Sequence, residues 1–88
     1  MMTVLEPSAE STAALQSGFG STTWTVSDLW VAVVGIGGDL RRSDIANITA
    51  GQRPATRGEH DILATALNEW FVHHDQNHPV ALWDGLPG

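Results

Sequence analysis

The strongest constraint on the fold of this chain is an amphipathic pattern that begins at Thr56. Thr56 and Glu59 have the spacing of a capping box, in which each side chain accepts a hydrogen bond from the backbone amide of the other residue. Apolar residues then recur at helical spacing until Pro79 approaches, so the pattern predicts a long helix over residues 57–76. Its inward face is formed by Ile62, Leu63, Ala66, Leu67, Trp70, Phe71 and His74. Its solvent face is formed by Asp61, Thr65, Asn68, Asp75 and Gln76.

Two shorter helices are predicted before this one. Residues 26–37 have helix-capping signals at Thr25 or Ser27 and are followed by a glycine pair that ends a helix. The valines in this segment also suit a strand, and a strand over residues 30–36 is therefore the alternative. Residues 43–50 are predicted to form the other short helix, with Ser43 as its N-cap and Gly51 just beyond its last turn.

These elements predict an all-α domain of three main helices over residues 24–88, or a small α+β domain if residues 30–36 form a strand. Residues 1–23 are rich in Ser, Thr and Gly, which favour a flexible tail with at most a short helix over 9–16. The apolar segment 80–83 is predicted to pack back on the core. A chain of 88 residues buries only a small core, so a homodimer or a bound partner would be a natural source of further stability.

The charge distribution is the most informative functional feature. The formal net charge is −6, so the molecule as a whole should repel nucleic acid and anionic membranes. All the basic side chains nevertheless fall in one segment of the chain, and acidic residues dominate on both sides of it. This arginine cluster can bind phosphate groups or an acidic protein, or it can simply be solvated. The cluster consists of Arg41, Arg42, Arg53 and Arg57.

Several kinds of chemistry lack the residues or the spacing that they need. The chain has no cysteine, which excludes disulfides and thiolate sites. The segment 31–38, VAVVGIGG, resembles a dinucleotide-binding turn, but the third glycine position is occupied by Leu40. The carboxylates are scattered, so we expect no catalytic centre, no enzymatic activity and no cofactor.

The histidines near the end of the long helix are the only candidate metal ligands. His74 and His78 have a spacing that can chelate zinc on a helix, but Pro79 disrupts the helix at this point. We therefore predict no metal site, although the sequence leaves metal binding by His73, His74 and His78 open.

The start of the chain lacks the pattern of a signal peptide, and the longest apolar run is much shorter than a bilayer span. We therefore expect a cytoplasmic protein without membrane association.

The stretch from Ser43 to Pro54, SDIANITAGQRP, and the later stretch ILATAL at 62–67 carry a resemblance to a known family. Over about residues 43–70 the chain resembles the second half of the lambda-repressor-like (Cro-type) helix-turn-helix domains. In that family the recognition helix has spaced isoleucines and ends in a G-x-R-x-P-like turn, and the next helix has an L-x-x-L-A-x-A-L-like pattern. The resemblance implies a small DNA-binding regulator, such as those of phages or other mobile elements, that acts on double-stranded DNA.

The same resemblance implies an interface. The helix that starts at Ser43 would enter the major groove, with Asn47 facing the bases. Ser43 and Gln52 would lie in the same interface, because they lie between Arg42 and Arg53 in the sequence. The residues implied to contact phosphates are Arg41, Arg42, Arg53 and Arg57.

An alternative function follows from the acidic charge and the tryptophans. The chain can be a small helical interaction module, an inhibitor or adaptor that does not itself bind DNA and whose acidic surface can mimic DNA. Trp24 and Trp83 flank the predicted helices and are the candidate anchors for a protein partner.

Overall fold

Four α-helices and one short 3-10 helix make up the part of the chain that the structure, a computed structural model, describes: residues 8–77 and 79–86. The helices are α1 (Ser8–Gly20), α2 (Val26–Gly35), α3 (Arg42–Thr49) and α4 (Arg57–His73), and the 3-10 helix is η1 (Trp83–Gly85). The described ranges contain no strand, which confirms the all-α prediction. The alternative strand over residues 30–36 is wrong, because residues 30–35 lie within α2.

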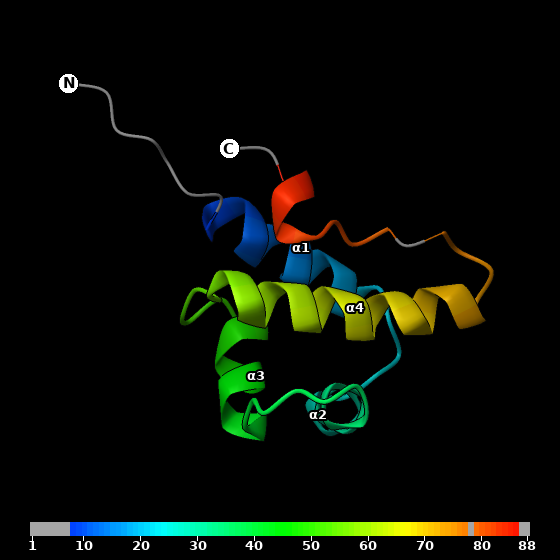
Figure 1. Cartoon of the computed structure of the whole chain (residues 1–88), viewed down its shortest axis with the longest axis horizontal. Helices are drawn as coiled ribbons and strands as arrows, with labels where there is room; N and C mark the ends of the chain where they lie inside the picture. The colour runs from blue at the N-terminus through cyan, green and yellow to red at the C-terminus, as the bar shows by residue number, and fades with distance from the viewer. Residues whose placement is uncertain (1–7, 78, 87–88) are drawn as a thin grey trace.

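Helix α4 is the central element of the fold. Figure 1 shows it running across the molecule, with α1 along one side and α2 and α3 on the other. Both α1 and α2 pack against α3 as well as against α4. The buried side chains that meet between these helices include Leu15, Leu29, Ile45, Leu63 and Leu67. One core therefore joins all four helices.

The capping box of α4 is confirmed, but the helix ends earlier than predicted. The Thr56 hydroxyl accepts from the Glu59 amide (3.2 Å), and the Glu59 carboxylate accepts from the Thr56 amide (2.9 Å). The last helical residue is His73 instead of residue 76. Asp75 has a left-handed φ of 60°, and the amide of the next residue donates to the Phe71 carbonyl (2.8 Å). This is the hydrogen bond of a Schellman ending, which normally uses glycine and is therefore hard to predict at an aspartate.

Helix α3 begins one residue before the predicted segment. Its N-cap is Arg41, and the Asp44 carboxylate accepts from the Arg41 amide (3.2 Å). The prediction that Ser43 is the N-cap is therefore wrong, and Ser43 lies in the first turn. Gly51 follows the helix with a φ of +76°, as the sequence predicted for the residue just beyond the last turn.

Helix α1 corrects the prediction of three helices and a flexible tail. Residues 8–20 form a helix, and its Leu15 and Ser11 side chains are completely buried. Residues 1–7 of the predicted tail lie outside the described part of the chain. The apolar surface of α1 is small, so its sequence gives only a weak helical signal. The segment is stabilised as a helix because Leu15 is buried where α1 packs on α3 and α4.

The chain returns to the core after α4. We call residues 79–86 the C-terminal strap. Val80 is buried in the core, as the apolar character of this segment predicted. Gly18 of α1 permits this approach, because a Cβ atom there would lie 2.7 Å from Cγ2 of Val80. The absence of a side chain at Gly18 thus lets the strap lie against α1.

Candidate functional site

Helix α3 turns one face to the core and the opposite face to solvent. Ile45 and Ile48 are completely buried, whereas Ser43 and Asn47 are exposed. Figure 1 places α3 at the periphery of the molecule. An eight-residue helix whose inner face is fixed by two isoleucines can present its outer face to a large ligand without rearrangement.

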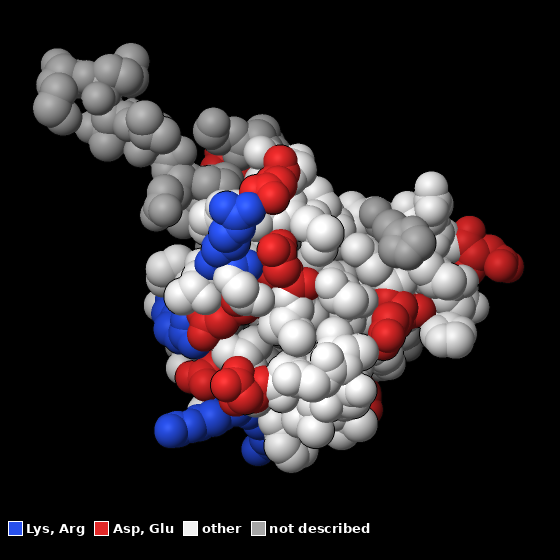
Figure 2. Space-filling model, viewed as in Figure 1, with Lys and Arg blue, Asp and Glu red and all other residues white. Residues whose placement is uncertain are grey.

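The start of α3 is the most cationic point of this face. Arg41 and Arg42 are both exposed, and Figure 2 shows basic side chains projecting at the lower left, where Figure 1 places this end of the helix. Arg42 donates a hydrogen bond to the Ser27 hydroxyl of α2 (3.0 Å). The ion pairs found among the described residues involve neither Arg41 nor Arg42. Their charges are therefore available to an anionic ligand.

Arg53 has a different environment from the arginines at α3. Its guanidinium donates two hydrogen bonds to the Glu59 carboxylate, each 2.9 Å long, and lies 3.6 Å from Asp44. The hydrogen bond from Arg53 is the main cause that lowers the pKa of Glu59 to about 2. Arg53 thus joins the starts of α3 and α4, and this ion pair competes with its predicted role as a phosphate contact.

The ion pair between Arg53 and Glu59 predicts an acid-sensitive stability. The pKa of Glu59 falls from an ordinary 4.5 to about 2 on folding. The ionised Glu59 therefore stabilises the folded state at pH values above its pKa in the unfolded chain, and this stabilisation is lost as the pH falls towards 2. We expect the melting temperature to fall between about pH 5 and pH 2, and less steeply in Arg53→Gln. Circular dichroism melts across this range measure the difference. Arg41→Gln is the charge-matched control, and equal slopes in wild type and Arg53→Gln would contradict the prediction.

Arg57 and Gln52 complete the predicted interface. Arg57 forms an ion pair with Asp84 of η1, and both side chains are largely exposed. Gln52 is exposed in the turn after α3. The structure therefore brings Arg41, Arg42, Ser43 and Asn47 together at α3, while Arg53 and Arg57 are engaged by carboxylates.

The polar side chains that bind the strap to α4 were missed by the sequence reasoning. Asn68, predicted on the solvent face of the long helix, is buried and bonds both backbone groups of Val80, donating to its carbonyl (2.8 Å) and accepting from its amide (3.0 Å). Asp61 accepts from the Trp83 amide (2.7 Å). These bonds attach the strap to α4. The available signal was an apolar strap whose backbone groups need partners once they are buried.

His60 connects three segments of the chain. Its Nε2 donates to the Ala81 carbonyl (2.8 Å), and its Nδ1 forms a hydrogen bond of 2.6 Å with the Ser11 hydroxyl. Both Ser11 and His60 are completely buried, so a substrate cannot reach them in this conformation. The pair therefore holds α1, α4 and the strap together.

The tryptophans predicted as partner anchors are partly buried. Trp24 packs against the core, and Trp83 contacts the His60 ring edge-to-face with a centroid distance of 5.9 Å. Helix α2 carries part of the exposed apolar surface instead, because its Trp30, Val31 and Val34 are 38%, 62% and 51% exposed.

The described residues contain no group of three or more histidine, aspartate and glutamate side chains that could hold a metal ion. His74 stacks on Trp70, and its Nδ1 lies 2.7 Å from the Trp70 carbonyl. His78 of the predicted cluster is outside the described part of the chain. None of the described helices has the length and apolar character needed to cross a membrane.

Comparisons of this chain with family models, with curated proteins and with solved structures found no match.

Proposed function

We propose that this chain is a small DNA-binding regulator that uses the outer face of α3. The observation that supports the proposal is the exposure of Ser43 and Asn47 on one face of α3, next to two arginines that have no ion pair within the described residues. An α-helix fits the major groove of DNA, and an asparagine on it can bond the edge of an adenine. Arginines at the helix start can contact the phosphates beside the groove.

The arrangement of the helices is consistent with this use. Helix α2 packs against α3, and Arg42 bonds to Ser27 at the start of α2, so the two helices form one unit. The acidic character of the rest of the molecule would limit non-specific binding to other DNA surfaces. Binding would therefore depend strongly on Arg41 and Arg42.

The double variant Arg41→Ala/Arg42→Ala is expected to weaken binding to duplex DNA by about tenfold or more. Its salt dependence should fall by about one unit of log K against log[salt] for each arginine, because each would release about one counterion. Fluorescence anisotropy with a labelled random-sequence duplex at about 50 and 200 mM salt measures both quantities.

The matched control for this experiment is Arg57→Ala. It also removes an arginine, but one that pairs with Asp84 away from α3, so its affinity should stay near that of wild type. No binding by wild type at the lower salt would overturn the proposal. If the control and the double variant lost equal binding free energy per arginine, the DNA interface would not be located at α3.

Protein binding is the second candidate function, and the exposed apolar side of α2 favours it. Val31 and Val34 are more than half exposed on the same side of the helix, and such apolar surface often takes part in protein association. The DNA titration separates the two candidates, because an interaction module without DNA affinity shows no salt-dependent binding to the duplex.

A further inference from the structure

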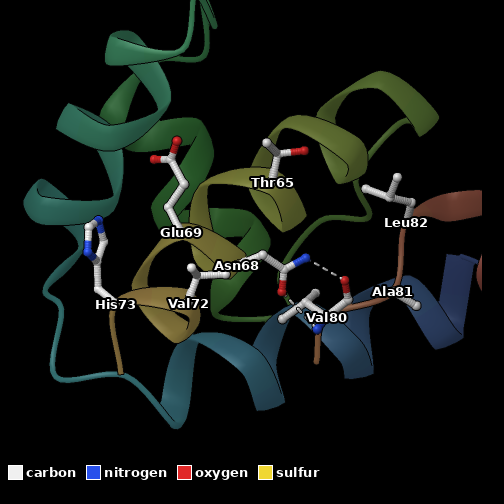
Figure 3. Close-up of a pocket in the computed structure, with 8 residues that line it drawn as sticks. All are labelled: Thr65, Asn68, Glu69, Val72, His73, Val80, Ala81 and Leu82. Atoms are coloured by element: carbon white, nitrogen blue, oxygen red, sulfur yellow. Dashed lines mark hydrogen bonds between the residues drawn. The ribbon is translucent and has the colours of Figure 1, made fainter. Parts of the chain in front are cut away.

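A groove of about 660 Å³ runs between the second half of α4 and the C-terminal strap. Figure 3 shows Thr65 and Glu69 along one side and Val80 and Ala81 along the other, with His73 and Leu82 at opposite ends. The volume lies within the range of about 300–1,000 Å³ that is usual for small-molecule sites. The groove does not include the outer face of α3, so its role is independent of the proposed DNA binding.

The two walls of the groove are held in place by hydrogen bonds. Asn68 bonds the amide and the carbonyl of Val80, as the dashed lines in Figure 3 show, and His60 bonds the next carbonyl along the strap. A ligand would therefore meet a groove whose shape is already formed. A preformed site lowers the entropy cost of binding.

The lining of the groove combines apolar surface with the polar side chains of Thr65 and Asn68, the imidazole of His73 and one carboxylate. Val72 and Leu82 are 47% and 50% exposed, so they present apolar area that water covers in the free protein. Glu69 is the only carboxylate among the lining residues, and neither lysine nor arginine lines the groove. Glu69 also has no ion pair within the described part of the chain. This chemistry is complementary to a cation that carries an apolar body.

We propose that this groove binds a small organic ammonium ion with an aromatic or alkyl body. The ammonium group would donate to the Glu69 carboxylate, a charge-assisted hydrogen bond that is stronger than a bond between neutral groups. The apolar body would cover Val72, which lies one turn along α4 from Glu69, and remove its surface from water.

The test uses three probes that share one body: 2-phenylethylammonium, the neutral 2-phenylethanol and the anionic 3-phenylpropanoate. Titration of ¹⁵N-labelled full-length protein, followed by amide chemical shifts, should give saturable binding of the ammonium ion with a Kd of about 1 mM. The shifts should be concentrated at residues 65–73 and 80–82. The neutral probe should bind more weakly, and the anion should bind most weakly.

Two variants separate the ionic and apolar contributions. Glu69→Gln should lower the affinity for the ammonium ion by about fivefold to tenfold, to a value close to the affinity for the neutral probe. Val72→Thr keeps the side-chain shape and should lower the affinities for the ammonium ion and the neutral probe by a few-fold. Glu10→Gln on α1 is the matched control and should bind as wild type does. Because Glu69 and Val72 are exposed, both variants should retain the wild-type circular dichroism spectrum.

The proposal is overturned if wild type shows no saturable shifts up to about 20 mM ammonium probe, or if the shifts map outside the groove. Equal affinity for the ammonium ion and the anion would also overturn it, as would an equal effect of Glu10→Gln and Glu69→Gln. None of these outcomes involves DNA, so they do not test the proposed DNA binding by α3, which is tested separately by the titration with duplex DNA.

Discussion

Leu67→Ala is expected to lower the free energy of unfolding by about 2–5 kcal/mol, because it removes most of a completely buried leucine from the core. Leu67 lies on the central helix α4, and a Cβ at Gly18 of α1 would lie only 3.5 Å from its Cδ1. The shortened side chain would therefore leave a cavity near the contact between α1 and α4. A small domain has a total stability of about 5–15 kcal/mol, so this loss is a large fraction of it.

Urea denaturation followed by tryptophan fluorescence measures this loss. Leu82→Ala is the matched control, because Leu82 is half exposed and the same truncation there should cost less than about 1 kcal/mol. Similar losses in the two variants would contradict the placement of Leu67 at the centre of the core.

Asn68→Ala is expected to have the second largest effect on stability. It removes both hydrogen bonds to the Val80 backbone, and each buried partner left without a hydrogen bond costs about 1–3 kcal/mol. The loss should be concentrated in the strap. Hydrogen exchange at the Val80 amide should therefore become faster than exchange within α4, while the urea midpoint falls.

Two comparison variants test this explanation. Asn68→Asp retains an acceptor for the Val80 amide but cannot donate to the Val80 carbonyl when ionised, so at least one of the two bonds should be lost. Asn47→Ala, on the exposed face of α3, should change stability by no more than about 0.5 kcal/mol. If the Val80 amide of Asn68→Ala exchanged hydrogen as slowly as in wild type, the side chain of Asn68 would not be what holds the strap.

The long helix was predictable because its signals are local. The reciprocal bonds of Thr56 and Glu59 join residues three apart, and the apolar residues after them recur at the helical period. The end of the helix was not predictable to the residue. An aspartate in a left-handed conformation ends it, and most sequence signals for such an ending are glycines.

The arginine segment illustrates a different limit. Four arginines close in sequence were predicted to form one interface. In the part of the chain that the structure describes, two of them form ion pairs with carboxylates and the other two do not. Glu59 and Asp44 engage Arg53, and Asp84, 27 residues along the chain, engages Arg57. Charge spacing along the chain cannot show such pairs, because they depend on how α4 and η1 are placed in space.

The sequence by itself determined the start of α4 and favoured a helical domain, with a strand over residues 30–36 left open, because capping boxes and apolar periodicity act within a few residues. Only the tertiary structure decided that residues 8–20 form part of the core and that Asn68 is buried. Residues 8–20 pack against α3 and α4, and Asn68 bonds to a strap that begins beyond the end of its own helix. Such partners are distant in sequence, so they can stabilise these residues only after the helices have packed.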